Sequence, residues 1–236
     1  MITSPHNEKL KLIRRLARKG RREREDLFVA EGEDLTGAAR RAGADPEVLL
    51  CAAGSGLEGE ETDPSLLAEA SGLGSGTRSI GVYHRAWAEP GTGPCVYLHG
   101  VSDPGNVGAV IRTGHALLGA TVVLGPGCAD PYSAKAVRAS MGSVFARPPA
   151  RGALSETPGP RAALVARGGE GLERLAGAVT LCLGAEREGL PAEVLERCEA
   201  AVTIPLRAGA ESLNVAAAAA IACERISSPP HPSEER

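Results

Sequence analysis

The sequence predicts an α/β protein with a mainly parallel sheet, helices on both faces of that sheet, and a small α/β domain in front of it. From residue 95 onward, short β-rich apolar runs alternate with helical patterns, which is typical of a parallel sheet covered on both faces. Aromatic residues are few, with two Phe, three Tyr and one Trp among 236 residues, so alanine and aliphatic side chains must form most of the interior. The Pro- and Gly-rich stretch 88-AEPGTGP-94 separates the two parts.

The first part, residues 1–88, has the pattern of a small α/β domain. We expect helices at 7–19 and 33–41, strands at 27–31, 47–51 and 79–83, and a further helix after the loop 54–65. Residues 89–94 are expected to form a linker between this domain and the next.

The second part, residues 95–228, predicts strands at 95–101, 121–125, 161–166, 179–184 and 201–205. Helices are expected from residue 106, over 131–140, over 192–197 and from 212 to 226. The tail 229–236 is polar and rich in proline, so we expect it to be disordered.

Composition narrows the classes of function. Nine Lys and Arg face a single Glu between residues 9 and 24, although the formal net charge of the whole chain is −3. This cluster is either a solvated helical face or a surface for an acidic polymer. The six cysteines form no C-x-x-C pair and no Cys/His cluster, which predicts reduced thiols and no metal site. No apolar run is long enough to span a bilayer, so we expect no membrane partner and a cytoplasmic protein.

Three loops follow apolar runs, where active sites of open parallel sheets gather. The first is 102-SDPGNVGAVIRTG-114, in which Asn106 can cap the next helix and Arg112 stands among apolar residues, where a buried arginine needs a partner. The second, 183-LGAEREGLP-191, carries Glu186, and the third, 204-IPLRAGAESLNVA-216, carries Ser212 and Asn214. Each loop alone is a weak signal, because a glycine loop after a strand is more often a turn than a ligand site and Ser212 is also an ordinary helix-capping residue.

Several familiar motifs are absent. The first loop has no G-x-G-x-x-G and the following strand does not end in an acid, which disfavours a dinucleotide site. The chain also lacks a P-loop motif, G-x-S-x-G and H-E-x-x-H.

Taken together, the three loops resemble the SpoU (TrmH) family of the SPOUT RNA methyltransferases. The matching segments are N-x-G-x-x-x-R-T at 106–113, L-G-x-E-x-x-G-L at 183–190 and I-P-L followed by S-L-N-V at 204–215. The stretch 130-DPYSAKAVRASMGSVFARP-148 is similar to the segment between the family's first and second motifs, and residues 7–35 resemble the L30e-like substrate-binding domain of many ribosomal RNA 2′-O-methylases.

The resemblance implies a C-terminal trefoil knot, S-adenosylmethionine as the cofactor, a ribose 2′-hydroxyl as the acceptor, and a homodimer that builds the active site. It makes Arg112 the catalytic arginine, with Asn106 orienting it or the ribose and Glu186 neutralising it. The remaining catalytic residues are Ser212 and Asn214, and the implied cofactor-binding residues are Leu183, Gly184, Ile204, Leu206, Leu213 and Asn214. The family often has serine where this chain has Ala216.

The resemblance also favours RNA as the partner of the basic cluster. The residues expected to contact RNA are Arg14, Arg15, Arg18, Lys19, Arg21, Arg22 and Arg138. The predicted function is S-adenosylmethionine-dependent 2′-O-methylation of RNA, with 23S ribosomal RNA as the leading substrate. A tRNA 2′-O-methylase, a ribosomal methylase that confers antibiotic resistance, and a catalytically silent RNA-binding or ribosome-assembly protein on the same fold remain the alternatives.

Overall fold

The computed structural model describes residues 1–72, 76–91, 93–209 and 211–228, and it divides into two compact units. The first unit contains Met1–Ala86 and Asp130–Ala146, and the second contains Trp87–Ala129 and the chain from Arg147 onward. Residues 130–146 therefore pack with the first unit, although the sequence suggested that they belong to the second domain. Position 92 of the expected linker and the expected disordered tail 229–236 lie outside the described residues.

A four-stranded sheet organises the first unit, with the strand order β1-β4-β2-β3. The strands are β1 (Leu27–Glu31), β2 (Val48–Ala52), β3 (Glu60–Thr62) and β4 (Ser79–His84). The central strand β4 is antiparallel to β1 and to β2, whereas β2 and β3 are parallel. The short strand β3 falls in the stretch that the sequence suggested was a loop.

Helices cover both faces of this sheet. Apolar side chains of α1 (Glu8–Leu16) and α4 (Pro64–Ala70) pack on one face with Leu50, Ile80 and Val82. The sequence predicted one helix over 7–19, but the chain is extended at Arg18, and a separate helix α2 (Lys19–Glu25) follows. The helices α3 (Glu33–Arg41), α6 (Ala134–Ser140) and α7 (Ser143–Ala146) complete the unit.

The segment 130–146 supplies half of an aromatic cluster in the first unit. Phe28 of β1 lies 4.7 Å from Tyr132 and 5.4 Å from Phe145 between ring centroids, and Tyr83 of β4 meets Phe145 edge-on at 4.9 Å. These distances are those of favourable aromatic pairs. The cluster explains why α6 and α7 fold with the small sheet.

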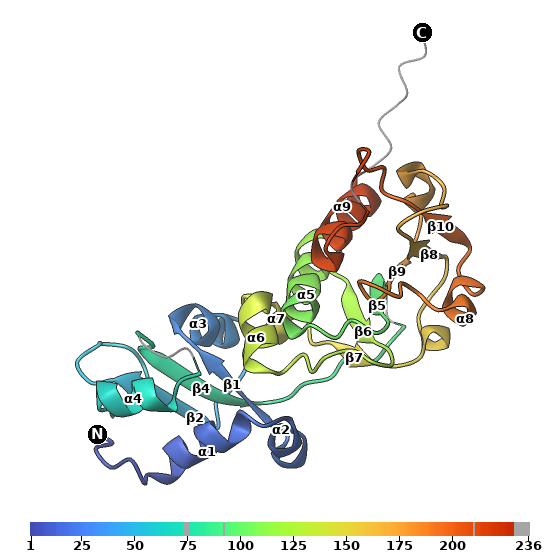
Figure 1. Ribbon diagram of the computed structural model, residues 1–236. Coiled ribbons are helices and arrows are strands. Elements are labelled where there is room, and N and C mark those ends of the chain that lie inside the picture. Colours follow the sequence, from blue (N-terminus) through green and yellow to red (C-terminus); the bar gives the residue numbers. More distant parts are fainter. Residues whose placement is uncertain (73–75, 92, 210, 229–236) are drawn as a thin grey trace. The chain divides into compact units, whose positions relative to one another are not determined.

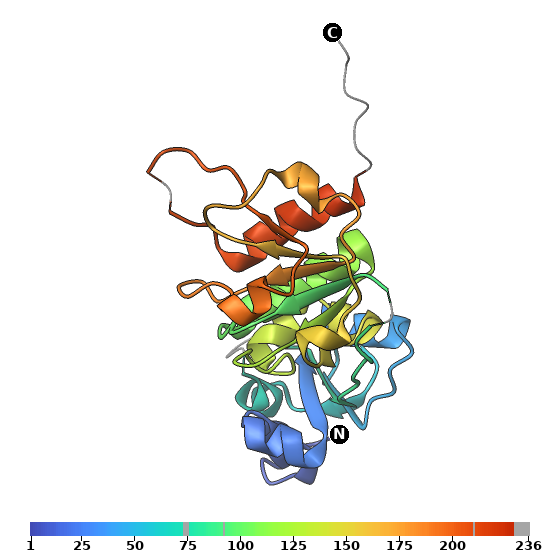
Figure 2. The same ribbon diagram turned by 90° about the vertical axis from the view of Figure 1, so that its right-hand side faces the viewer.

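The second unit contains the parallel sheet that the sequence predicted. Its six strands, in the order β10-β8-β9-β5-β6-β7, are all parallel to their neighbours (Figures 1 and 2). They are β5 (Cys95–Leu98), β6 (Thr121–Leu124), β7 (Ala150–Arg151), β8 (Arg161–Leu164), β9 (Thr180–Leu183) and β10 (Ala200–Val202). The two-residue strand β7 is the one that the sequence pattern did not indicate.

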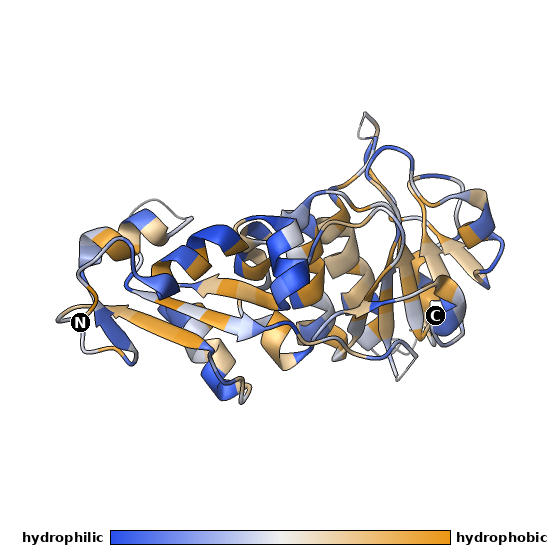
Figure 3. Cartoon of the chain, turned by 90° about the horizontal axis from the view of Figure 1, so that it is seen from below, coloured by the Kyte–Doolittle hydropathy of each residue, from blue (hydrophilic) through white to orange (hydrophobic). Residues whose placement is uncertain are grey.

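Two long helices, α5 (Pro104–Leu118) and α9 (Val215–Ser227), lie side by side over one face of this sheet (Figure 1). They bury a common core with Val96, Leu98 and Leu181. The opposite face carries α8 (Ala192–Leu195). Two 3-10 turns, Leu154–Glu156 and Leu172–Leu175, complete the unit. Figure 3 shows the strands as mostly apolar, as expected for a sheet buried on both faces.

Capping residues set where α5 and α9 begin. Asp103 accepts a hydrogen bond from the backbone N–H of Asn106, and Pro104 occupies the first turn, so α5 starts two residues earlier than expected. Gly119, with a φ of 58°, ends α5 in the left-handed conformation. Asn214 caps α9 by accepting from the backbone N–H groups of Ala216 and Ala217.

Candidate active site

A pocket of about 340 Å³ opens at the carboxyl ends of three neighbouring strands, β10, β8 and β9. This is the edge at which parallel sheets place their ligands. The segments lining it are 164–166 after β8, 183–190 after β9, and Ile204, Leu206, Ser212, Leu213, Val215 and Ala218 from the last loop and helix. The second and third motif loops thus meet around one cavity.

The loop 184–190 is held in a tight fold by its own backbone. The N–H of Gly189 donates to the carbonyl of Ala185 at 2.9 Å, and these two residues form an isolated antiparallel bridge. A Cβ on Gly184 would collide with the backbone of Gly189 and Leu190, so only glycine fits at this point. The loop therefore presents backbone groups and small residues to the pocket.

A chain of hydrogen bonds joins one residue from each motif. The Nδ2 of Asn214 donates to Oδ1 of Asn106 at 2.9 Å, and Nδ2 of Asn106 donates to Oε1 of Glu186 at 2.5 Å. A carboxylate only accepts, so Asn106 must turn its NH₂ group toward Glu186 and its oxygen toward Asn214. The oxygen of Asn214 then faces the N-terminus of α9, where it accepts two backbone hydrogen bonds. The orientation of both amides follows from this chain.

Arg112 does not take part in this chain, which corrects two expectations. The arginine is exposed rather than buried, because Val107, Val110, Ile111 and Gly114 form the buried stripe of α5. Glu186 is bonded to Asn106, and Arg112 makes no hydrogen bond or ion pair with another residue in the part of the chain that the structure describes. Six residues of α-helix rotate by about 240° beyond a full turn, which turns Arg112 to another side of α5 from Asn106.

The structure brings most of the remaining expected residues to the pocket. Among the expected cofactor-binding residues, Leu183, Gly184, Ile204, Leu206 and Leu213 line it, and so do the expected catalytic residues Glu186 and Ser212. Asn106 and Asn214 contribute through the hydrogen-bond chain instead.

Sequence reasoning missed a third wall of the pocket. Leu164 ends β8, Val165 and Ala166 follow it, and Leu190 and Val215 close the apolar lining. The sequence could have indicated this wall, because the strand expected at 161–166 also ends at the carboxyl edge of the sheet. Its loop contains no motif, so it drew no attention.

This arrangement can hold an elongated, partly apolar ligand and leave a polar group at its end. Leu183, Leu206 and Leu213 give apolar surface, whereas Glu186 and Ser212 add a carboxylate and a hydroxyl to the lining. The carboxylate keeps one oxygen for Asn106, so Oε2 is available to accept from a bound group.

Five of the basic residues of the first unit surround a second, purely basic hollow. Lys11, Arg14, Arg15, Arg18 and Arg21 line a surface cavity of about 340 Å³. Three of these residues form ion pairs: Lys11 with Glu8, Arg14 with Glu69, and Arg15 with Glu25. The exposed Arg18 and Arg21 make no ion pair or hydrogen bond through their side chains within the described ranges. Lys19 lies 3.8 Å from Glu23, and Arg138 is exposed on α6.

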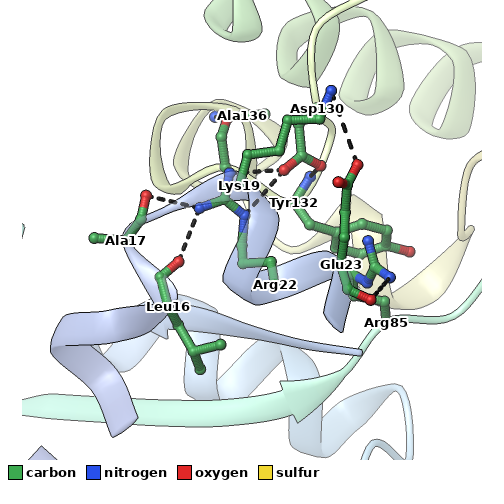
Figure 4. Close-up of polar contacts among 10 residues, drawn as sticks. Leu16, Ala17, Lys19, Arg22, Glu23, Arg85, Asp130, Tyr132 and Ala136 are labelled. Carbon is green, nitrogen blue, oxygen red and sulfur yellow. Dashed lines mark hydrogen bonds and ion pairs between the residues drawn. The ribbon is translucent and has the colours of Figure 1, made fainter. Parts of the chain in front are cut away.

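Arg22 differs from its neighbours and corrects one expected RNA contact. Its side chain is only 7% exposed and binds the carboxylate of Asp130 through Nε at 2.9 Å and Nη2 at 2.7 Å (Figure 4). Its Nη1 donates to the carbonyls of Leu16 and Ala17, both at 2.8 Å, at the end of α1. Arg22 is therefore a structural residue of the first unit, because burial and four hydrogen bonds keep it from a phosphate.

The described residues contain no group of three or more His, Cys, Asp or Glu side chains placed to hold a metal ion. Among those same residues, no helix is both long and apolar enough to cross a bilayer.

Comparisons with known proteins agree with this geometry. Residues 93–224 match the model of the SpoU rRNA Methylase family, and residues 7–79 match the MRM3-like substrate binding domain. An uncharacterised tRNA/rRNA methyltransferase of Mycobacterium tuberculosis is 38% identical over 143 residues, which cover 53% of this chain and 48% of that protein. This chain thus spans about half the length of its mycobacterial relatives.

Two further relatives align along nearly the whole chain. The 23S rRNA (guanosine(2553)-2′-O)-methyltransferase RlmP of Bacillus subtilis is 31% identical, with 93% of this chain and 96% of RlmP covered. The crystal structure of an AdoMet-bound rRNA methyltransferase from Sinorhizobium meliloti has a TM-score of 0.83 and 29% identity, with 95% of each chain covered. With its three motif loops gathered at one edge of a parallel sheet, the chain belongs to the SpoU rRNA methylase family.

Proposed function

We propose that this protein transfers a methyl group from S-adenosylmethionine to a ribose 2′-hydroxyl of 23S ribosomal RNA. The observation that carries the proposal is the pocket at the ends of β8, β9 and β10, with the Asn214–Asn106–Glu186 chain joining the three motifs of the family. We place this activity in the cytoplasm, the compartment expected from the lack of a long apolar run in the sequence.

The pocket fits the proposed cofactor in size and lining. Its volume of about 340 Å³ lies in the range of small-molecule sites. Leu183, Leu206 and Leu213 would contact the adenine and ribose, and the backbone of the loop 184–190 would offer N–H and C=O groups to the polar parts. When bound, S-adenosylmethionine supplies an electrophilic methyl group on its sulfonium.

The protein's own contribution is to position the acceptor and manage one proton. Asn106 holds Glu186 through Oε1, which leaves Oε2 to accept a hydrogen bond from a ribose hydroxyl at the mouth of the pocket. An arginine stays protonated in nearly all settings, so Arg112 suits the role of a donor to the ribose and its phosphate better than that of a base.

We further propose that the active site is completed by a second copy of the chain, within a homodimer and around a trefoil knot formed by the loops at the pocket. The position of Arg112 supports this, since it is exposed and turned away from Asn106 on α5. A guanidinium in this position is available to the pocket of a partner subunit.

Ribosomal RNA is the substrate that we favour over tRNA. The alignment with RlmP covers both units, and the match to a substrate-binding domain covers residues 7–79 of the first. Arg18 and Arg21 of that unit make no side-chain ion pair or hydrogen bond with any described residue, so they give it two cations for phosphate contacts.

Three measurements test the proposal. Titration calorimetry should show binding of S-adenosylmethionine, and purified protein should methylate 23S rRNA at a 2′-hydroxyl that nuclease mapping locates. Methylation of tRNA and not of rRNA would establish the tRNA alternative. Binding of RNA without any methyl transfer, in protein that binds no S-adenosylmethionine, would establish the silent RNA-binding protein instead.

A further inference from the structure

Two thiols meet beneath the pocket loop. The Sγ atoms of Cys182 and Cys198 are 3.7 Å apart, and the chain between them contains the whole loop 184–190 and α8. No sign of this pair was visible in the sequence, because residues 182 and 198 are not spaced as in any known cysteine motif. Packing of α8 on the sheet brings them together.

The two thiols differ in their freedom to move and to react. Cys182 is fully buried in β9, where it pairs with Tyr97 of β5 on one side and Ala163 of β8 on the other. Cys198 is half-buried and lies just after α8, at a connection between elements. The hydrogen bond with Cys198, together with burial, raises the pKa of Cys182, whereas the same hydrogen bond lowers the pKa of Cys198. Cys198 is therefore the thiol that ionises first and that a reagent reaches.

We propose that Cys182 and Cys198 form a disulfide when a hydroperoxide reaches Cys198, and that this bond lowers the affinity of the adjacent pocket for S-adenosylmethionine. The formation of the bond is independent of the proposed function, whereas its effect on affinity rests on it.

The chemistry balances with the hydroperoxide as oxidant. The Cys198 thiolate attacks the peroxide, an S–O bond forms, the O–O bond breaks, and the leaving oxygen takes up a proton. The thiol of Cys182 then attacks the sulfenic sulfur, the S–S bond forms, and the hydroxide that leaves takes the proton of Cys182 to become water. Two thiols and one hydroperoxide thus give one disulfide, one water and one alcohol, or a second water when the oxidant is hydrogen peroxide.

The geometry connects this bond to the pocket. A disulfide needs the sulfur atoms at about 2.0 Å, so the pair must close by well over an ångström. Strand β9 is held between two neighbours, so the movement falls on Cys198 and α8. Val194 of α8 shares a buried cluster with Leu190, and Leu190 lines the pocket. A shift of α8 therefore displaces one wall of the pocket.

Linkage gives a quantitative form to the proposal. If the disulfide weakens binding of S-adenosylmethionine by a factor of about five, saturating S-adenosylmethionine must shift the thiol–disulfide equilibrium toward the thiols by the same factor. Both quantities can be measured on the full-length protein, the first by calorimetry and the second in a dithiothreitol redox buffer.

The experiment treats purified protein with hydrogen peroxide and maps peptides without reduction. We expect a cross-linked pair of peptides carrying Cys182 and Cys198, reversed by dithiothreitol, and absent from Cys198→Ser. Cys128→Ser is the matched control, because Cys128 is also half-buried but its thiol is bonded to the carbonyl of Leu98, and the cross-link should persist there. Wild-type mapping decides the point even if a variant fails to fold.

Two outcomes would overturn the proposal. One is a sulfenic acid trapped at Cys198 by dimedone with no cross-link to Cys182. The other is a complete cross-link that leaves the affinity for S-adenosylmethionine unchanged. If the reduced protein binds no S-adenosylmethionine, the proposed function fails, and peptide mapping still decides whether the disulfide forms.

Discussion

Replacing Arg22 with alanine should lower the free energy of unfolding of the first unit by about 3–5 kcal/mol, the usual cost of breaking a buried ion pair. The variant removes two hydrogen bonds to Asp130 and two to the carbonyls of Leu16 and Ala17. Among the residues that the structure describes, the 4% exposed Asp130 side chain then keeps only the backbone N–H of Tyr132 as a donor (Figure 4). The uncompensated carboxylate is the main source of the loss.

Urea denaturation followed by circular dichroism measures this change. With a slope of about 2 kcal/mol per molar urea, the midpoint should fall by about 1.5–2.5 M. Arg21→Ala is the matched control, and loss of this exposed side chain, which has no partner in the described part of the chain, should change stability by less than about 0.5 kcal/mol. A loss below about 1 kcal/mol for Arg22→Ala would refute the assignment of Arg22 as a structural residue.

A double-mutant cycle separates the pair from its surroundings. The variant that carries both Asp130→Leu and Arg22→Met should lose about 1–3 kcal/mol less free energy of unfolding than the two single variants lose together, because the double variant leaves no buried charge. Additive single changes would mean that the two side chains do not stabilise each other.

Four other predictions concern the active site and the RNA surface. Asn106→Ala should reduce methyl transfer by about 10- to 100-fold, the loss expected for one charge-assisted hydrogen bond, while S-adenosylmethionine still binds. Loss of S-adenosylmethionine binding would instead place Asn106 in the pocket wall. Gly184→Ala should abolish S-adenosylmethionine binding in calorimetry, and an unchanged affinity would contradict the close approach in the loop. Charge reversal of Arg18 and Arg21 should weaken RNA binding and flatten its salt dependence, whereas an unchanged slope would mark a solvated face. If Arg112 serves the partner's pocket, equal mixing of the impaired Arg112→Ala and Asn106→Ala subunits should raise activity to about a quarter of the wild-type value, because half of the dimers then contain one intact site. No recovery after subunit exchange would refute a shared site.

Local patterns in the sequence predicted much of the fold. Strands such as β5 and β9 are buried on both faces and read as continuous apolar runs, so their positions and parallel arrangement could be inferred. Strand β7 has two residues and β3 has three, which is too short for any periodic signal. The packing of 130–146 with the first unit depends on Tyr132 and Phe145 meeting Phe28, and such a long-range contact leaves no local trace.

The site was predictable in its location but not in its pairings. The rule that ligands gather at the carboxyl ends of parallel strands correctly brought Glu186 and Ser212 to one pocket. The expected pairing of Glu186 with Arg112 is not made within one chain, because Glu186 bonds to Asn106 and Arg112 lies exposed on another side of α5. Arg22 could not be told from its neighbours in a run of arginines, since only its partner Asp130, 108 residues away, distinguishes it.

The chain passes between its two units three times, after Ala86, Ala129 and Ala146. The small unit is consequently not a module that one cut can release. A fragment ending at residue 88 would lack Tyr132 and Phe145 and would leave the rings of Phe28 and Tyr83 facing water. Exchange of this unit between relatives therefore requires two segments to be inherited together, and the residues on either side of that aromatic cluster must change in concert.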